Sequence, residues 1–421
     1  MKGTLRLSIL ACGIFTVAMA HYYQSQVGMT GDLPAVSFGR KTTFATLLCT
    51  FLSIQCILPT HASPISNTLN PSTALRMNHI QLKGTHNSYH REPPLGLRLI
   101  FESVIPSPWN YYYSHSSVSD QLSQQSVRSL EFDVRADSKG GLYANPLLPR
   151  IAGVPVPDEA KMKLPGAKVM HIADADVLST CYTFRDCLEQ VKAWSDAHPR
   201  HVPIPIDIEF KTNDEKLEAL GGAKAEKWDE ESLAALDEEI RSVFAEDRLV
   251  TPDFVRTDGL SLEESVLLMG WPTLEESRGM VMFYMDNDDG DIRDAYRSGG
   301  RNNLEGRVLF TNSDEGEDDA AFLKRNDPTG DNLEEIRELV RKGYFVRTRA
   351  DVPIETVEKE NNTVMRDLAW ESGAQIVSTD FPAVGMACRY DTDYAVLMPG
   401  GGVARCNPIN APDGCKDDEL E

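Results

Sequence analysis

Short apolar runs recur along this chain, and several of them are separated by stretches with helical periodicity. Two such stretches lie at 184–194 and 233–244, where apolar side chains return every three or four residues. The alternation of apolar runs with helical stretches is typical of parallel βα units. Eight strands are expected, at 79–85, 129–135, 168–172, 202–210, 280–285, 307–311, 343–349 and 374–379. Eight such strands with crossovers predict an α/β fold, a single (β/α)8 barrel of the TIM type.

The barrel is expected to span residues 63–410, between an apolar amino-terminal region, 1–62, and an acidic tail, 411–421. Region 1–62 contains two apolar stretches, 7–20 and 44–58, each preceded by basic residues. Each has about 15 residues, the length of a signal-peptide core rather than of a membrane span. The sequence does not choose between them. The protein is therefore expected to be secreted, or anchored to a membrane if stretch 7–20 is retained.

Beyond residue 62 the chain has five cysteines, and export would place them in an oxidising compartment. Cys181 and Cys187, six residues apart, are the first expected disulfide. Cys388 is expected to pair with Cys406 or Cys415 and so to hold the tail. The odd number leaves at least one cysteine unpaired.

Polar side chains collect where the expected strands end. Six of the eight strands contribute to a set that is unusual for core strands: His86, Asn87, Glu131, Asp133, Arg135, His171, Asp207, Glu209, Lys211, Arg347, Arg349 and Asp380. Barrel active sites lie at the carboxyl ends of the strands. Strand alternation puts 131, 133 and 135 on one face, and likewise 207, 209 and 211. Facing the helices, these charges would be buried without partners, so they are expected to face inward. Ion pairs that close the barrel rim are the alternative interpretation.

This set suits acid–base catalysis beside a cation. His86 and His171 end two different strands, and imidazole exchanges protons near neutral pH, so both are candidate catalytic residues. Candidate Ca²⁺ ligands are the oxygen donors Asn87, Glu131, Asp133 and Glu209. Candidate substrate-binding residues are Arg135, Lys211, Arg347, Arg349 and Asp380. Three other histidines, His115, His198 and His201, lie in polar loops or near a helix end and are expected to be surface or capping residues.

The formal net charge of −22 limits the partners. Binding to a nucleic-acid backbone depends on clustered Lys and Arg, so no nucleic-acid partner is expected. A substrate that carries phosphate would also be repelled unless a bound cation or a few arginines reverse the local charge. The calcium ligands and the pair Arg347 and Arg349 are the two candidates for that reversal.

Five segments together resemble the calcium-dependent phosphoinositide phospholipase C family of bacteria and fungi. They are 83–89 (Lys-Gly-Thr-His-Asn-Ser-Tyr), 130–135 (Leu-Glu-Phe-Asp-Val-Arg), 170–171 (Met-His), 206–209 (Ile-Asp-Ile-Glu) and 344–351 (Tyr-Phe-Val-Arg-Thr-Arg-Ala-Asp). The likeness spans about residues 76–410. The resemblance implies that the inositol 2-hydroxyl attacks phosphorus, which releases diacylglycerol and forms a cyclic 1,2-phosphate. By similarity His86 and His171 share the proton transfers, with His171 as the acid, and Asn87, Glu131, Asp133 and Glu209 match the calcium positions.

Arg135 is a departure from the calcium-using pattern. In metal-free bacterial relatives, an arginine two residues after the strand-two aspartate takes the place of calcium. This chain has Arg135 there and also keeps Asn87, Glu131 and Glu209, which those relatives do not need, so calcium is the favoured expectation.

The expected substrate is phosphatidylinositol or a related membrane lipid, bound by a monomer in transient contact with a membrane surface. The fifth expected strand lacks the lysines with which eukaryotic relatives read the 4- and 5-phosphates, so an unphosphorylated or glycosylated headgroup is favoured. Trp109, Tyr111, Tyr112 and Tyr113 suit either a lipid interface or packing over the barrel mouth. Two other functions stay open: a glycerophosphodiesterase or sphingomyelinase-D-like phosphodiesterase, and a non-catalytic phosphoinositide-binding barrel.

Overall fold

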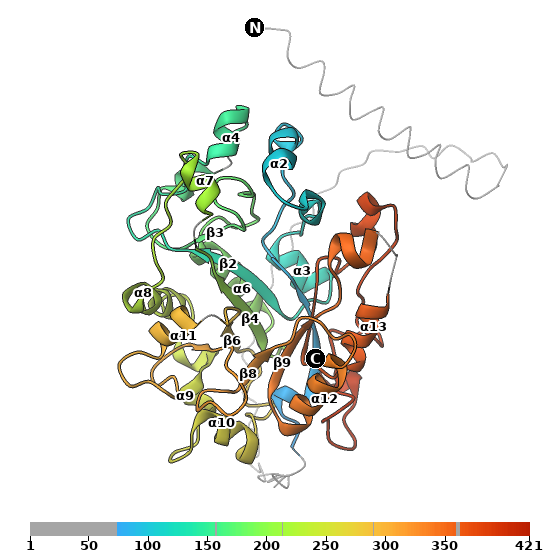
Figure 1. The fold of residues 1–421 in the computed structure, drawn as a ribbon. Coiled ribbons are helices and arrows are strands. Elements are labelled where there is room, and N and C mark those ends of the chain that lie inside the picture. Colours follow the sequence, from blue (N-terminus) through green and yellow to red (C-terminus); the bar gives the residue numbers. More distant parts are fainter. Residues whose placement is uncertain (1–73, 156–157, 213, 289, 359–362) are drawn as a thin grey trace, which may run out of the picture. The chain divides into compact units, whose positions relative to one another are not determined.

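The computed structural model describes residues 74–421 except 156–157, 213, 289 and 359–362 (Figure 1). The apolar stretches 7–20 and 44–58, on which the predicted signal or anchor depends, lie outside the described residues. Within the described ranges, no helix is both long and apolar enough to span a membrane.

The strands of the described part form two sheets. One has the order β11-β1-β10-β9-β8, and the other has the order β3-β2-β4-β6-β5, with β7 also paired to β6. Their bounds are β1 Ile80–Thr85, β2 Leu130–Arg135, β3 Lys168–Val169, β4 Ile204–Phe210, β5 Leu249–Val250, β6 Val281–Met285, β7 Leu309–Phe310, β8 Phe322–Lys324, β9 Phe345–Arg349, β10 Ile376–Thr379 and β11 Ala404–Cys406.

Most strand pairs are parallel; β11 with β1 and β3 with β2 are antiparallel. Two parallel bridges, Gly84 with Ser129 and Asn312 with Phe322, connect the two sheets. A side chain at position 84 would place its Cβ 3.1 Å from side-chain atoms of Ile376 and of Ser129, so the close approach of β1 to β2 favours glycine.

Helices follow many of the strands. Their bounds are α2 Arg98–Val104, α3 Val118–Gln124, α4 Leu147–Ala152, α5 Glu159–Met162, α6 Phe184–Ala197, α7 Glu215–Ala219, α8 Glu230–Arg241, α9 Pro252–Val255, α10 Leu262–Glu264, α11 Gly290–Tyr296, α12 Asn332–Lys342 and α13 Val364–Glu371. The predicted helical stretches 184–194 and 233–244 correspond to α6 and α8. Thr183 caps α6 by accepting the backbone N–H of Asp186, and Gly343, at φ 114°, ends α12.

Strand alternation separates the core from the polar face. On β2, Leu130, Phe132 and Val134 are buried in the main hydrophobic core, where Phe132 meets Phe184 of α6 at a ring distance of 6.4 Å. The residues between them on β2 point to the opposite face. Because β2 and β4 are parallel and in register, Glu131 lies beside Asp207 and Asp133 beside Glu209. The predicted charged face is therefore continuous across the two strands.

The structure corrects the predicted strand list: the strand expected at 168–172 is shorter, and β5, β8 and β11 were not predicted. The expected strand 168–172 is only the two-residue β3, and it runs antiparallel to β2 rather than parallel to it. A strand that was not predicted, β8 (Phe322–Lys324), lies parallel to β9. Three residues are too few to give a period-2 signal, and an acidic loop precedes β8, so the pattern could not reveal it.

One predicted disulfide is confirmed and one cysteine was misassigned. Cys181 and Cys187 are bonded. Cys406 is bonded to Cys415, and Cys388 is free and exposed, so the prediction that Cys388 pairs with one of them is wrong. Pairing depends on Cα separation in space, about 4.4–6.8 Å, and sequence spacing does not report it.

Candidate active site

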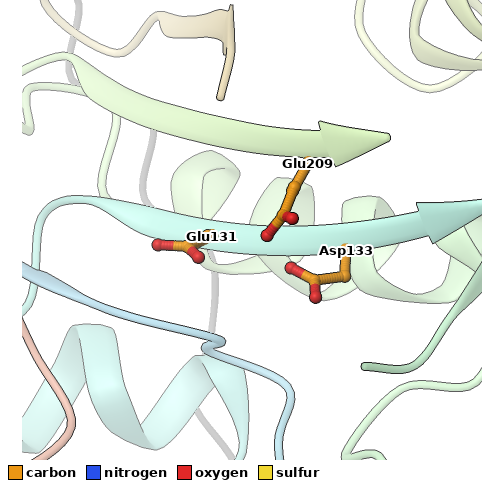
Figure 2. Close-up of side chains that lie close together, drawn as sticks. All are labelled: Glu131, Asp133 and Glu209. Atoms are coloured by element: carbon orange, nitrogen blue, oxygen red, sulfur yellow. The ribbon is translucent and has the colours of Figure 1, made fainter. Parts of the chain in front are cut away.

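Three carboxylates from the neighbouring strands β2 and β4 lie close together (Figure 2). One oxygen from each of Glu131, Asp133 and Glu209 lies within 4.8 Å of the others. Glu131 and Asp133 are buried and Glu209 is half-buried. Burial raises the pKa of Asp133, and the charges of Glu209 and Glu131 raise it further. Like charges held this close call for a cation between them.

Lys211, one residue beyond β4, supplies a cation to this cluster. Its Nζ lies 2.9 Å from Asp133 Oδ2 and 2.6 Å from Glu209 Oε1. Burial opposes the charged form of Lys211, but the two carboxylates outweigh burial and raise its pKa. The residue predicted to bind substrate therefore neutralises two of the predicted metal ligands in this structure.

The donor set fits a calcium ion. Asp133 is buried, with Oδ2 against the Lys211 ammonium and Oδ1 without a hydrogen-bond partner among the described residues. Asn87 Oδ1 accepts only a long hydrogen bond from the Tyr89 hydroxyl, at 3.3 Å. Hard oxygen donors from carboxylates and an amide are the ligands that Ca²⁺ takes. Lys211 is shared by Asp133 and Glu209, and Arg347, which pairs with Glu131, also lies 3.5 Å from Asp207 and Asp286. The carboxylates therefore outnumber these cations, and a divalent ion can balance the remaining negative charge.

His86 follows β1 and is held between two acidic groups. Its Nδ1 lies 2.7 Å from Asp380 Oδ1, and its Nε2 lies 3.6 Å from Glu131 Oε1. Arg349 joins this group, with Nη2 3.0 Å from Asp380 Oδ2 and Nη1 3.5 Å from His86 Nε2. Burial alone would raise the pKa of Asp380, but His86 and Arg349 outweigh it and lower that pKa to about 2. Asp380 is therefore a fixed anion that orients the imidazole.

His171 follows β3 and faces His86 across the carboxylates. Its Nε2 lies 4.0 Å from Asp133 Oδ2, and its Nδ1 lies 3.6 Å from Asp176 Oδ2. The ring of Tyr111 packs against it with a centroid distance of 5.3 Å. Burial lowers the pKa of His171, and the nearby charge of Lys211 lowers it further. Both predicted catalytic histidines thus turn Nδ1 to an aspartate and Nε2 to the carboxylate cluster.

A cavity of about 220 Å³ joins the two histidines. Its lining includes five of the predicted site residues: His86, Asn87, His171, Arg349 and Asp380. Asn110, Tyr111, Tyr113, Val352 and Pro353 complete it. A second cavity, of about 400 Å³, shares Arg349 and Val352 with the first and has Asp327 and Glu355 in its lining.

Two of the predicted substrate-binding arginines are engaged by the protein itself. Arg135 is buried and donates from Nη1 to the carbonyl of Thr212 and from Nη2 to the carbonyl of His171, both at 2.7 Å. Arg347 is also buried and sits at the centre of an anionic group: it pairs with Glu131, lies 3.5 Å from both Asp207 and Asp286, and donates to Asn326 Oδ1 at 2.7 Å. Their substrate-binding role stays a prediction.

The sequence interpretation misjudged two histidines, of which His115 lies at the site and His201 does not, and it missed one aspartate of the site. His115 was expected on the surface but is buried, and its Nε2 donates to the carbonyl of His86 at 2.8 Å. His201 is likewise buried and bonds Ser195 at 2.6 Å. Asp176 was not singled out, although an Ala-Asp-Ala-Asp segment directly after His171 was a usable signal.

The family model for Ca²⁺-dependent phosphoinositide phospholipase C matches residues 75–408. The chain belongs to this family. The predicted family, the predicted phosphoric diester hydrolase class and the predicted calcium cofactor are thereby confirmed. The glycerophosphodiesterase and sphingomyelinase-D-like alternatives are correspondingly disfavoured.

Solved structures similar to this phospholipase C include two bacterial enzymes. The calcium-dependent phosphoinositol-specific phospholipase C of a Gram-negative Pseudomonas species is 15% identical, with a TM-score of 0.48 over 80% of this chain and 97% of that one. The Ca²⁺-dependent phosphatidylinositol-specific phospholipase C of Streptomyces antibioticus is 16% identical, with a TM-score of 0.47 over 76% of this chain and 98% of that one. No protein of curated function matches the chain.

Proposed function

We propose that this phospholipase C cleaves the phosphodiester of phosphatidylinositol, releasing diacylglycerol and inositol 1,2-cyclic phosphate. The observation that carries the proposal is the pair of histidines, His86 and His171, lining one cavity beside the carboxylates Glu131, Asp133 and Glu209. A phosphodiester seated in that cavity would have an imidazole on each side of phosphorus. In-line displacement needs a base for the attacking oxygen and an acid for the leaving one.

His86 is the better placed base and His171 the acid. Asp380 fixes Nδ1 of His86, so Nε2 is left to accept the proton of the inositol 2-hydroxyl. The oxygen of that hydroxyl then bonds to phosphorus, and the bond from phosphorus to the diacylglycerol oxygen breaks. His171 would give its Nε2 proton to the departing oxygen, which leaves as neutral diacylglycerol.

Calcium would be held by Glu131, Asp133 and Glu209 together with Asn87. When bound, it supplies Lewis-acid chemistry that lowers the pKa of the attacking hydroxyl. Arg349, which lines the cavity beside His86, is the cationic side chain best placed to receive a phosphate oxygen or an inositol hydroxyl.

An unphosphorylated headgroup fits best. The cavity that continues past Arg349 has the carboxylates Asp327 and Glu355 in its lining, and these would repel additional phosphates on the ring. β6, which reads Val-Met-Phe-Tyr-Met, offers no lysine to bind such phosphates. Phosphatidylinositol or a glycosylated derivative is therefore the proposed substrate.

The proposed catalytic domain is a single closed (β/α)8 barrel within residues 63–410, followed by an acidic tail at 411–421. Eight strands support closure, since β1, β2, β4, β6, β7, β8, β9 and β10 are linked in that order by parallel pairs and by the two parallel bridges between the sheets. Secretion, or anchoring through stretch 7–20, stays part of this proposal, supported by the two disulfides. We also propose a monomer that binds no nucleic acid, for which the net charge of −22 is the support.

Membrane contact is proposed for the tips of α2, α4 and α7, which follow β1, β2 and β4 and so lie at the end of the fold that carries the site (Figure 1). Four large aliphatic side chains are exposed there: Leu95 (79%), Leu99 (86%), Ile151 (60%) and Leu220 (64%). Exposed leucines grouped beside a cavity are typical of an interaction surface. We call this set the apolar rim. Of the aromatics after β1, Tyr113 is buried and lines the cavity, and Tyr112 is buried with its hydroxyl donating to Glu102 at 2.8 Å, so neither faces lipid.

The decisive experiment incubates the chain from residue 63 onward with phosphatidylinositol vesicles, with Ca²⁺ or with EGTA, and follows soluble and lipid phosphates by ³¹P NMR and free inositol by chromatography. Inositol 1,2-cyclic phosphate should appear only with calcium. Phosphatidic acid or free inositol would instead indicate a phospholipase D type of cleavage, and no product at all with calcium would refute the proposal. His86→Ala and His171→Ala should each lower turnover by about 10² to 10⁴-fold without loss of folding.

A further inference from the structure

The two histidines of the site have matching surroundings. Each turns Nε2 toward a carboxylate of the cluster and Nδ1 toward an aspartate outside it. For His86 that aspartate is Asp380, at the end of β10. For His171 it is Asp176, which belongs to the turn that directly follows His171.

Asp176 is placed to accept a hydrogen bond from His171. The distance from His171 Nδ1 to Asp176 Oδ2 is 3.6 Å, slightly longer than a hydrogen bond, and catalytic hydrogen bonds often tighten only when substrate binds. Both partners have spare capacity. His171 Nδ1 and Asp176 Oδ1 are buried, and neither has a hydrogen-bond partner among the described residues. The oxygen nearer to His171 is Oδ2, which also meets His90 Nε2 at 2.9 Å, whereas Oδ1 is the unpartnered oxygen. A small rotation of the imidazole or of the carboxylate would complete the contact with His171.

Asp176 is itself held in place by His90 and by the backbone of its own turn. His90 Nε2 lies 2.9 Å from Asp176 Oδ2, and the ring of His90 packs on Tyr113 at 4.5 Å. The backbone of Asp176 bonds to that of Ile172 in both directions, at 2.9 and 3.2 Å. The aspartate and the histidine therefore belong to one rigid turn.

The turn is also tied to neighbouring elements. Asp174, in the left-handed region at φ 70°, accepts the backbone N–H of Leu147 at 2.7 Å and that of Ala223 at 2.6 Å. Arg135 Nη2 donates to the backbone carbonyl of His171 at 2.7 Å. With the backbone of His171 fixed on both sides, only the imidazole needs a partner to set its orientation and tautomer.

We propose that Asp176 is the positioning residue of His171, holding the proton on Nδ1 so that Nε2 performs the transfer, as Asp380 does for His86. The inference rests on the proposed function. In the transfer, His171 with protons on both nitrogens gives the Nε2 proton to the diacylglycerol oxygen as the bond from that oxygen to phosphorus breaks. Burial and the charge of Lys211 oppose this doubly protonated ring, and the carboxylate of Asp176 is the group that favours it. The Nδ1 proton stays in the hydrogen bond to Asp176, which favours the positively charged ring before transfer and fixes the neutral tautomer after it.

The test compares two substrates that differ only in their need for an acid. The leaving group of phosphatidylinositol is diacylglycerol, whose alkoxide oxygen needs a proton. The leaving group of an inositol nitrophenyl phosphodiester is nitrophenolate, which departs without one. Asp176→Asn should lower kcat on phosphatidylinositol by about 10²-fold and on the aryl substrate by less than about 10-fold, with KM nearly unchanged. His171→Ala should have the same pattern. In the His171→Ala background, Asp176→Asn should lower kcat little further, because Asp176 acts through the imidazole that is already absent.

Asp237→Asn is the matched control. Asp237 is also buried and hydrogen-bonded, at 2.7 Å to the Tyr296 hydroxyl, but it lies in α8 away from the cavity. Its replacement should slow both substrates equally or not at all. Thermal unfolding and circular dichroism check that each variant is folded, and His90→Gln, which loosens Asp176 without touching His171, should have a weaker effect of the same pattern.

Three results would overturn the inference: an Asp176→Asn enzyme with more than a third of normal turnover, an equal loss on both substrates, or a full additional loss in the His171→Ala background. A wild-type chain inert toward both substrates would instead refute the proposed function, and the inference would fall with it.

Discussion

Replacing Lys211 with methionine tests whether the ammonium is the counter-ion that holds the carboxylate cluster together without metal. The change keeps much of the aliphatic stem and removes the charge that lies 2.9 Å from Asp133 and 2.6 Å from Glu209. At an effective dielectric constant of about 20, two unit charges about 5 Å apart repel by roughly 3 kcal/mol. Proton uptake by Asp133, whose pKa burial and the neighbouring carboxylates already raise, limits the loss of unfolding free energy to about 2–3 kcal/mol.

The same removal should strengthen calcium binding. In the wild-type chain a divalent ion must displace the ammonium from Asp133 and Glu209, and in Lys211→Met it need not. An energy of about 2–3 kcal/mol corresponds to a roughly 30 to 150-fold lower Kd for calcium. Without calcium the Tm should fall by roughly 3–6 °C, and saturating calcium should restore most of it.

Titration calorimetry and thermal melts in EGTA and in millimolar calcium measure these effects without any activity assay. Lys192→Met is the matched control, because Lys192 also pairs with a carboxylate, Asp196 at 2.5 Å, but on the exposed face of α6. That pair should contribute little. A Lys211→Met protein with unchanged Tm in EGTA and unchanged calcium affinity would refute the counter-ion argument.

Three further predictions concern stability, pH and the membrane. Arg347→Met leaves Glu131, Asp207 and Asp286 without their shared cation and should lower the free energy of unfolding in urea by about 3–5 kcal/mol. Removal of the surface pair of Arg389 with Glu92 should lower it by under about 1 kcal/mol. Equal losses would contradict the assignment of Arg347 as the shared cation. Burial lowers the pKa of His115 to about 4, so between about pH 6.5 and 4 the unfolded chain binds a proton there that the folded chain does not, and stability should fall by roughly 3 kcal/mol as pH falls through that window. His115→Gln should remove that share of the pH dependence, measured by unfolding at pH 4.5 and 7, and an unaltered slope would exclude His115 as its source. Leu95→Asp with Leu99→Asp should weaken vesicle binding by about 10-fold or more while leaving turnover of a short-chain soluble substrate unchanged, and Leu268→Asp, equally exposed in the segment Ser265–Met269 that precedes β6, should do neither.

The charged face of β2 and β4 could be predicted because a strand has a fixed period of two. Glu131, Asp133 and Glu209 needed only the strand assignment to fall on one face, and the parallel register then brought them together. His171 lines the cavity beside His86, but the strand from which that place was predicted is wrong. His171 follows a two-residue antiparallel strand rather than a barrel strand, and neither strand direction nor a tight turn leaves a periodic signal.

Contacts between residues that only folding brings together could not be predicted from the sequence. The burial of His115 follows from the carbonyl of His86 and the surrounding loops, not from its own polar neighbours in the sequence. Asp176 became visible only because its turn folds back against both His90 and His171. The free Cys388 has the same origin, since the Cys406–Cys415 bond closes within the tail itself.

An acidic protein would repel an anionic substrate unless positive charge is available at the site, and the cationic side chains there are already paired within the protein. Lys211 is shared by two carboxylates, and Arg349 is paired with Asp380. Arg347 is surrounded by three carboxylates, and Arg135, the residue that could have replaced a metal, spends both terminal nitrogens on backbone carbonyls. The guanidinium and ammonium groups that a phosphate would meet in the cavity are therefore already paired with carboxylates or hydrogen-bonded to backbone carbonyls. Calcium bound at the carboxylate cluster, as we propose, would supply the positive charge that these residues do not, and this accounts for a chain that has both Arg135 and the oxygen ligands.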